Sequence, residues 1–473
     1  MRQVKLEALA PHRLEALIGP ARTDQFEAAA GGTRALLEGR RVLNVNSTAT
    51  GGGVAELLQT LLPYALGVGV DGAWAVIDGS PAFFEITKRL HNHLYGTPGD
   101  GGTLGETARG SYEATLASNA EALRSLIRPS DIVVLHDPQT AGLTEVARQA
   151  GGIVVWRCHV GRDTSNPYTD EGWAFLRPYV EAADAFVFSR AAFIPDWIEP
   201  ARASVIPPSL DPFSPKNEDL ADHDVPAILQ YAGLVAGDGA VPDIAFTRPD
   251  GTTGRLERHA SLLDTGPAPA IGTPLVVQIS RWDRMKDMTG VLRGFVEHVD
   301  PALGAHLLLV GPDVRGVEDD PEGGAVLAEC VAARRQLSAE DARRVHLVCL
   351  PMEDPDEQAV IVNALQRYAS VVTQKSLAEG FGLTVTEAMW KRRPMVASRV
   401  GGIGDQIRDH REGLLVDDPE DLAGFGRAVS LLLEDRALAD SLAEGARERV
   451  FNEYLPDRHL ERYAEFFAGL ARL

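Results

Sequence analysis

Cysteine is scarce in this chain, whose 473 residues include only Cys158, Cys330 and Cys349. These three form no CxxC pair, and their number is odd. A disulfide framework and a cysteine-based zinc site are therefore not indicated, and we expect no structural metal. A reducing cytoplasm is the expected location.

Long apolar runs and basic tracts are also missing. No stretch approaches the roughly 18 apolar residues that span a bilayer, and the N-terminal MRQVKLEALAPHRLEALIG lacks the apolar core of an export signal. The formal net charge of −21, spread along the chain, disfavours non-specific binding of nucleic acid. We therefore expect small-molecule partners, with neither nucleic acid nor membrane. Any polyanionic ligand must be met by a few placed Arg and Lys residues.

What the sequence does contain is an alternation of short apolar runs and amphipathic helical stretches, which predicts an α/β protein with parallel sheets. The length favours two domains. Strands are predicted in the first half at Arg41–Asn46, Ala73–Ile77, Asp131–Leu135, Ile153–Arg157 and Ala185–Phe188. In the second half they are predicted at Leu275–Ser280, His306–Val310, Val345–Cys349, Ser370–Thr373 and Pro394–Ala397.

A proline-rich segment, IPPSLDPFSPKNEDL from Ile206, separates the two sheets and suits an interdomain crossing. The stretch from about 222 to 273 is Gly- and Pro-rich and contains a hairpin pattern, FTRPDGTTGRLE, with Asp250 and Gly251 as turn residues. We interpret this stretch as an insertion without chemistry.

Two clusters follow predicted strands, where open α/β sheets bind their ligands. Gly51, Gly52 and Gly53 lead into a helix, an arrangement that offers backbone N–H groups to a phosphate or a sugar oxygen. Arg281 and Lys286 follow the strand Leu275–Ser280 and can clamp a diphosphate. Each cluster alone is weak evidence for a ligand site, because glycine turns are often structural and Arg and Lys side chains are usually solvated.

The segment EGFGLTVTE places Glu379 and Glu387 on either side of a Gly-Phe-Gly turn. Gly380 and Gly382 predict a loop that leads into a helix, which brings both acids toward one ligand at the helix N-terminus. A purely structural alternative is equally compatible with the local pattern. Thr384 and Glu387 fit an S/T-x-x-E capping box.

Several segments together resemble a known family. Three segments resemble the nucleotide-sugar half of the retaining GT-B glycosyltransferases grouped as family 4. They are ISRWDRMK, LLLVGPD and SLAEGFGLTVTEAMWKRRPMVASRVGGIGDQI. Five further segments resemble a narrower group, the trehalose-forming glycosyltransferring synthases and the related retaining trehalose phosphorylases. They are NSTATGGGVAELL, FFEITKRLHNHLYG, LHDPQT, WRCHVGRD and IPPSLDPFSPKN.

The resemblance implies an α/β GT-B fold, with two Rossmann-like domains facing each other across a cleft. The implied domains are an acceptor-side domain at 1–215, a nucleotide-sugar domain at 216–455 with the insertion at 222–273, and a helix at 456–473 that crosses back. It further implies transfer of glucose from a UDP-, ADP- or GDP-glucose co-substrate to glucose, which gives trehalose reversibly. The resemblance implies no metal or other cofactor. It implies a homodimer.

Site roles also follow from the resemblance. Catalysis is expected of His159, Arg281, Lys286 and Glu379. Donor binding is expected of Gly52, Gly53, Arg281, Lys286, Glu379, Gly380, Phe381, Gly382, Leu383 and Glu387. Acceptor binding is expected of Asp137, Gln139 and Arg157.

One position departs from the group, in which an acidic residue is expected two after the histidine. Gly161 stands there, followed by Arg162 and Asp163. Three alternatives stay open: a retaining trehalose phosphorylase, a glucosyltransferase acting on another small acceptor such as a compatible solute or natural product, and a non-catalytic sugar sensor.

Overall fold

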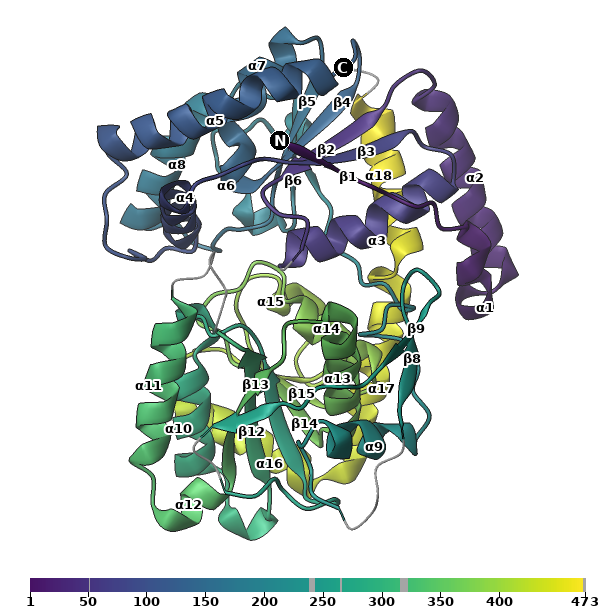
Figure 1. The fold of residues 1–473 in the computed structure, drawn as a ribbon. Helices are drawn as coiled ribbons and strands as arrows, with labels where there is room; N and C mark the ends of the chain where they lie inside the picture. Colours follow the sequence, from purple (N-terminus) through teal and green to yellow (C-terminus); the bar gives the residue numbers. More distant parts are fainter. Residues whose placement is uncertain (51, 238–242, 264–265, 315–321, 471–473) are drawn as a thin grey trace. The chain divides into compact units, whose positions relative to one another are not determined.

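The computed structural model describes residues 1–473 except 51, 238–242, 264–265, 315–321 and 471–473 (Figure 1). Contacts divide the chain into two compact units. Unit 1 comprises Met1–Leu210 and Glu453–Leu473, and unit 2 comprises Asp211–Asn452. The chain thus leaves unit 1 after Leu210, rather than after residue 215 as the sequence suggested, and returns to it at Glu453.

Unit 1 is built on a seven-stranded sheet in the order β1-β3-β2-β4-β5-β6-β7, in which β1 alone runs antiparallel to its neighbour. All five strands predicted for this half are present, shifted by a residue at most. The short edge strands β1 and β7 were not predicted. The strands are β1 (Arg2–Val4), β2 (Val42–Asn46), β3 (Gly72–Val76), β4 (Ile132–His136), β5 (Ile153–Cys158), β6 (Ala185–Phe188) and β7 (Ala203–Val205).

Helices cover both faces of this sheet, and side chains that alternate along each strand enter two cores. On β5, Val154 and Trp156 pack into one core, while Val155 packs into the other. This alternation is the period of two that a strand imposes. The helices are α1 (Glu15–Ile18), α2 (Pro20–Leu36), α3 (Gly53–Gly67), α4 (Pro81–Leu94), α5 (Glu106–Leu126), α6 (Asp137–Thr140), α7 (Thr144–Gln149), α8 (Pro167–Val180) and α18 (Pro456–Leu470).

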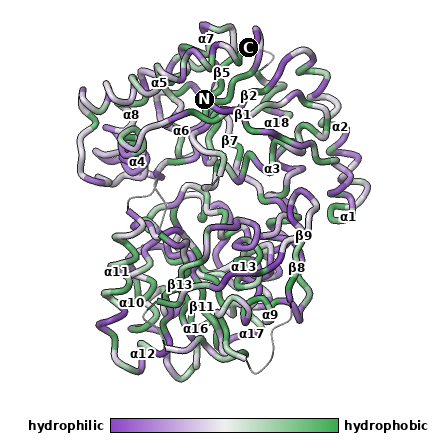
Figure 2. The backbone as a smooth tube through the Cα atoms, viewed as in Figure 1, coloured by the Kyte–Doolittle hydropathy of each residue, from purple (hydrophilic) through white to green (hydrophobic). Residues whose placement is uncertain are grey.

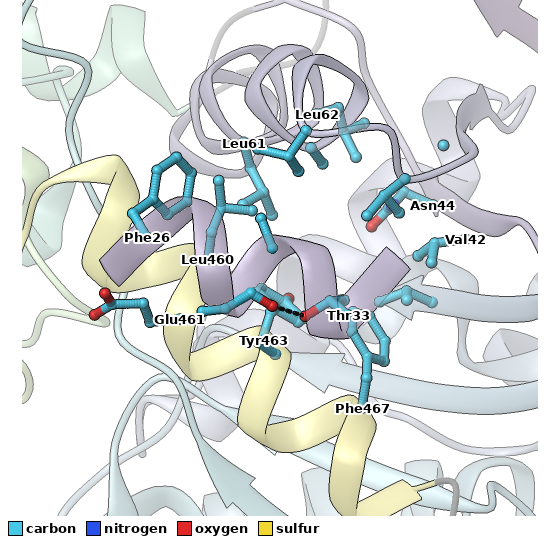
Figure 3. A pocket seen from close by; sticks show the side chains of 18 residues that line it. Phe26, Thr33, Val42, Asn44, Leu61, Leu62, Leu460, Glu461, Tyr463 and Phe467 are labelled. Carbon is cyan, nitrogen blue, oxygen red and sulfur yellow. Dashed lines mark hydrogen bonds between the residues drawn. The ribbon is translucent and has the colours of Figure 1, made fainter. Parts of the chain in front are cut away.

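Helix α18, drawn in yellow in Figure 1, packs against α2 and α3 of unit 1. The Arg22 guanidinium donates to both carboxylate oxygens of Asp457, at 2.6 and 3.0 Å. A small apolar cavity of about 50 Å³ lies between these helices and the sheet. Figure 3 shows the side chains that line it, which include Phe26, Leu61 and Phe467. The C-terminal helix is therefore part of the first unit's core.

Unit 2 holds a second seven-stranded sheet, in the order β10-β13-β12-β11-β14-β15-β16, with β10 antiparallel to β13. The strands of both sheets are largely hydrophobic, as their green colour in Figure 2 shows. All five strands predicted for this half are present, whereas β10 and β16 were not predicted. The strands are β10 (Ser261–Leu263), β11 (Leu275–Ile279), β12 (His306–Pro312), β13 (Val345–Leu350), β14 (Val371–Gln374), β15 (Met395–Ser398) and β16 (Leu414–Val416).

The segment interpreted as an insertion is more integral than expected. It contains the predicted hairpin, formed by β8 (Ala245–Thr247) and β9 (Thr253–Arg255), but it also supplies β10, the edge strand of the unit 2 sheet. The helices of unit 2 are α9 (Asp224–Tyr231), α10 (Met288–His298), α11 (Gly323–Arg335), α12 (Ala339–Arg343), α13 (Pro355–Tyr368), α14 (Leu383–Trp390), α15 (Ile403–Gln406), α16 (Leu422–Glu434) and α17 (Arg436–Glu453).

All three cysteines are buried thiols that form no disulfide. Among the helices of the described residues, none combines the length and apolar character needed to cross a membrane.

Candidate functional site

Lys286 and Glu379 meet at the carboxyl ends of the unit 2 strands. Lys286 ends a short 3₁₀ turn, Arg284–Lys286, that follows β11, and Glu379 lies in the loop after β14. The Lys286 Nζ is 2.5 Å from Oε2 of Glu379, and Ser376 Oγ is 3.4 Å from the same oxygen. The structure thus brings together two of the residues that the sequence singled out.

Gln278, which the sequence analysis did not identify, ties the two loops together. Its buried amide donates to the Lys286 carbonyl at 2.7 Å and accepts from the Lys375 N–H at 3.0 Å. Lys375, fully buried in the next loop, forms an ion pair with Asp287, the N-cap residue of α10. A polar side chain inside the otherwise apolar run LVVQI was the signal that could have revealed Gln278.

Arg281 lies on the same loop as Lys286, but it does not share the contact with Glu379. Its side chain is 55% exposed, and its Nη2 is 3.7 Å from Oδ2 of Asp283. The exposed guanidinium and the largely shielded ammonium, whose side chain is 17% exposed, give this loop two cations in different surroundings. Such a pair can bind a diphosphate through the planar fork of arginine and the point charge of lysine.

The Gly-Phe-Gly turn is held by close backbone contacts. Gly382 has φ +87° and is the N-cap of α14, which therefore begins without a side-chain cap. The Gly402 N–H donates to the Gly380 carbonyl at 3.1 Å, and Gln406 donates to the Phe381 carbonyl at 2.5 Å. A Cβ on Gly401 would lie 1.7 Å from the Glu379 carbonyl oxygen. Glycine is required there because the turn packs directly on it.

The capping-box alternative for Glu387 is wrong. Thr384 lies inside α14, because the helix already begins after Gly382. The Glu387 carboxylate is buried and is approached by Gln366 Nε2 at 3.4 Å and by Lys216 Nζ at 3.5 Å. Glu387 therefore points its carboxylate at side chains of neighbouring segments and not back at the N-terminus of its own helix.

In unit 1, Asp137 follows β4 and contacts the end of β5. Its backbone has φ +60°, a left-handed conformation that aspartate tolerates better than most residues. Its Oδ1 accepts from the backbone N–H of His159 at 2.7 Å. Burial raises the pKa of Asp137 to about 7, and the His159 N–H acts in the opposite direction. Asp137 and His159 are therefore neighbours.

His159 belongs to a hydrogen-bonded chain of neutral side chains. Its Nε2 is 3.2 Å from Nδ1 of His136, whose Nε2 is 3.0 Å from Oδ1 of Asn44. Ser189 Oγ is 3.4 Å from the His159 Nδ1. Burial lowers the pKa of both imidazoles well below the usual histidine range. Since the Asn44 oxygen accepts, His136 donates from Nε2 and His159 donates to His136, which sets both tautomers.

Two residues predicted to bind the acceptor differ in accessibility. Gln139 is half-buried on α6. Arg157 has no exposed surface; its guanidinium bonds to the Tyr463 hydroxyl and to the Ile206 carbonyl and lies over the Tyr463 ring. The fully buried side chain of Arg157 thus holds α18, and its role toward an acceptor stays a prediction.

The anomalous Gly161 has a steric explanation. A Cβ at this position would lie 2.4 Å from the ring of Phe193, so the aromatic side chain occupies the space that a larger residue would need. Asp163 pairs with Arg190 at 2.7 Å and does not turn toward this position. Asp163 could have replaced the expected acidic residue from a shifted loop, but its carboxylate is engaged by Arg190 instead.

The glycine cluster after β2 lies only partly within the described residues, because Gly51 falls outside them. Gly52 has φ +109° and is the N-cap of α3, and Gly53 begins the helix. This geometry leaves the start of a 15-residue helix without side chains and suits an anion or a sugar oxygen. No cluster of three or more metal-binding side chains occurs in the described part of the chain.

Comparison with known proteins matches each half of the chain separately. Residues 44–195 match the family described as trehalose synthase, N-terminal domain, and residues 272–449 match glycosyl transferases group 1. The crystal structure of an α,α-trehalose-phosphate synthase (UDP-forming) from Burkholderia vietnamiensis shares the fold, with a TM-score of 0.64 and 16% identity over 92% of this chain and all of that one.

Relatives of similar length are more alike in sequence. A trehalose synthase from Rubrobacter xylanophilus is 34% identical over 92% of this chain and 91% of its own, and one from Thermococcus litoralis is 33% identical over 91% and 90%. A trehalose phosphorylase from Pleurotus sajor-caju is 26% identical over 86% of this chain but only 55% of its own. The chain is a glycosyltransferase with the GT-B fold, and it belongs to the trehalose synthase family.

Proposed function

We propose that this protein is a retaining glycosyltransferase that moves glucose from a nucleoside-diphosphate glucose to the anomeric hydroxyl of glucose, forming α,α-trehalose reversibly. The observation that carries the proposal is the contact of Lys286 with Glu379 beside the Gly-Phe-Gly turn. It joins a cation suited to a diphosphate with a carboxylate suited to sugar hydroxyls. The relatives named trehalose synthase supply the substrate class.

The donor roles fall to unit 2, with a contribution from Gly52 and Gly53. Lys286 and Arg281 neutralise the diphosphate as the glycosidic bond breaks, a task that fixed charges perform well in a site closed to water. Glu379 and the backbone of Phe381, Gly382 and Leu383 bind the hydroxyls of the transferred glucose. The carboxylate of Glu387 accepts from the ribose hydroxyls of the nucleotide.

The acceptor roles fall to unit 1. Asp137 accepts a hydrogen bond from an acceptor hydroxyl, and the half-buried Gln139 is close to it in the chain. His159 is assigned to the anomeric carbon of the donor. Because His159 is neutral and its tautomer is set by His136, it orients the sugar and does not act as a strong acid.

Retention follows from attack on the same face from which the phosphate departs. The acceptor oxygen forms the new bond to the anomeric carbon, the bond to the phosphate oxygen breaks, and that phosphate oxygen takes the acceptor proton. No nucleophilic side chain and no metal take part, since Lys286 and Arg281 supply the positive charge. This route differs from that of hydrolases, in which paired carboxylates act on the glycosidic bond.

The test is NMR analysis of products after incubation with UDP-, ADP- or GDP-glucose, with glucose and other small acceptors, in the presence and absence of phosphate and chelator. An α,α-linked disaccharide formed from one of these donors is the expected result. Release of glucose 1-phosphate from trehalose and phosphate without nucleotide would instead establish a phosphorylase. An absence of turnover with all donors, together with ligand-induced thermal stabilisation, would establish a sensor.

A further inference from the structure

A buried lysine, Lys391, connects α14 to the segment that enters unit 2 from unit 1. Its side chain is 3% exposed, and its Nζ lies within bonding distance of three oxygens. These are Oε1 of Gln366 at 2.7 Å, Oδ1 of Asn217 at 2.9 Å and the Glu387 carbonyl at 3.3 Å. Burial lowers the pKa of Lys391 to about 7, and the charge of Glu387 acts in the opposite direction. The lysine and Glu387 are thus coupled through space as well as through the helix.

Lys391 sets the orientation of the amide that touches Glu387. Because Gln366 presents its oxygen to Lys391, its amide nitrogen points the other way, toward Oε2 of Glu387 at 3.4 Å. The Lys391 ammonium, which faces three oxygens, has donors only, so the reverse orientation of this amide would place two donors against each other. Oε2 of Glu387 is therefore held by a chain of hydrogen bonds that begins at Lys391 and passes through Gln366.

The same lysine holds the entering segment. Asn217, whose oxygen accepts from Lys391, donates from its amide nitrogen to the Asp211 carbonyl at 3.0 Å. The Asn217 carbonyl accepts from the Trp390 indole at 3.1 Å. On α13, Asn363 donates to the carbonyls of Pro215 and Glu218 at 3.0 and 2.9 Å. These bonds hold residues 215–218 against α13 and α14, so the position of Lys216 is determined by bonds on both sides of it.

Lys216 approaches the other oxygen of Glu387. Its Nζ is 3.5 Å from Oε1, and its side chain is 26% exposed, compared with 7% for Glu387. Each carboxylate oxygen has two acceptor positions, so Glu387 can accept a ligand hydroxyl without releasing Lys216 or Gln366. An ammonium carries three donors, so Lys216 can donate to the oxygen of the same hydroxyl that donates to Glu387.

We propose that Lys216 binds the ribose of the nucleotide donor together with Glu387, and that Lys391 is the positioning residue that holds both of them in place. The inference rests on the proposed function, which assigns the ribose to Glu387. Residues 215–218, in the segment that enters unit 2 from unit 1, thereby become part of the donor site, although they lie far from α14 in sequence. A ribose hydroxyl then meets an acceptor from α14 and a donor from residue 216, an arrangement that favours a ribonucleotide over its deoxy form.

The test is calorimetric titration of the full chain with ADP, GDP and UDP and with their 2′-deoxy and 3′-deoxy forms. For the preferred base, the wild type is expected to bind the ribonucleotide about 10- to 100-fold more tightly than a deoxy form, the scale of a hydrogen bond to a charged group. Lys216→Met and Lys391→Met are each expected to reduce this preference about tenfold, which corresponds to the loss of one such hydrogen bond. Lys5→Met, at an exposed lysine of unit 1, is the control and keeps the full preference.

The outcomes separate the inference from the function on which it rests. If the wild type and Glu387→Gln bind ribo and deoxy forms alike, the ribose assignment of Glu387 fails. If Glu387→Gln loses a preference that Lys216→Met retains in full, the inference about Lys216 is overturned. Should Lys391→Met not fold, Gln366→Leu interrupts the same chain to Glu387. A change in melting temperature with an unchanged ribo-to-deoxy ratio would show a structural role alone and overturn the positioning role.

Discussion

The ammonium of Lys286 lies 2.5 Å from Oε2 of Glu379, although the two residues are 93 positions apart in the chain. Their side chains are 17% and 9% exposed, so the pair is largely shielded from water. In such surroundings a charge contact is stronger than at the surface, and the loss of one partner leaves the other buried. Lys286 therefore orients Glu379, and under the proposed function it would also present its charge to an incoming diphosphate.

Replacing Lys286 by alanine is expected to lower kcat/KM for transfer by at least about 100-fold, the usual effect of removing one group that stabilises transition-state charge. The Glu379 carboxylate left without its partner is expected to lower the melting temperature, but unit 2 should remain folded because Lys286 lies in a short turn outside the hydrophobic core. Steady-state kinetics and circular dichroism check the two expectations, with Lys5→Ala as the control. Unchanged kinetics would refute the assignment of Lys286 to the diphosphate.

Gly382→Ala is expected to impair donor binding through the turn geometry. The new Cβ would lie 3.2 Å from Cγ of Glu379 and 3.3 Å from Cγ1 of Ile403, at a backbone φ of +87°. Gly272→Ala is a matched control, because Gly272 has φ +88° and open space around its Cβ position. Both variants carry the cost of positive φ, about 1 kcal/mol.

Only Gly382→Ala should raise the Kd for the nucleotide-sugar, as measured by calorimetry. An equal change in both variants would mean that backbone strain alone is responsible and that Glu379 is not displaced.

The sequence predicted the interior of both sheets well, since buried parallel strands are continuous apolar runs such as IVVLH and LVVQI. Edge strands of three residues, such as β7 and β10, contain too few side chains to produce a pattern. The structure places Asp137 beside His159 because β4 and β5 are neighbours and the loops at their carboxyl ends share one edge of the sheet.

Long-range contacts were not predictable in the same way. Periodicity indicates that Arg157 shares a face with His159, but not that Tyr463, some 300 positions later, would cover it. Likewise, the contact of Lys216 with Glu387 depends on how the crossing segment docks on α13 and α14, which no local pattern specifies. Packing between distant segments determines these partners.

The raised pKa of Asp137 predicts a pH dependence of stability. The group titrates near 4 when unfolded and near 7 when folded, so the folded state holds the extra proton between these values. Stability is therefore lost as the pH rises from about 4 to about 7, by roughly 4 kcal/mol in total, since one pKa unit is about 1.4 kcal/mol.

Asp137→Asn removes this dependence while it keeps an oxygen for the His159 N–H and a residue that tolerates positive φ. The melting temperature of the wild type minus that of Asp137→Asn should fall across this range and level off above it, as followed by scanning calorimetry. A difference that rises with pH would contradict a pKa of Asp137 that burial raises.

The ion pair of Arg22 with Asp457 predicts how firmly α18 is held in unit 1. Both carboxylate oxygens are engaged, and the side chains are 10% and 0% exposed. Asp457→Asn leaves the guanidinium buried without its counter-charge, which is expected to destabilise unit 1 by about 3 to 5 kcal/mol. Asp440→Asn, which removes an exposed partner of Arg436 on α17, is the control and should have little effect.

The double variant Arg22→Met, Asp457→Leu distinguishes charge from packing. If the penalty of Asp457→Asn comes from an unpaired buried charge, replacing both partners by apolar side chains should recover most of the lost stability, because no desolvated charge remains. Scanning calorimetry of the full chain resolves the unfolding of each unit as a separate transition when the two units unfold independently. The change in stability should then appear in the transition of unit 1. A double variant as unstable as the single one would show that the shape of the bidentate pair, and not its charge balance, keeps α18 in place.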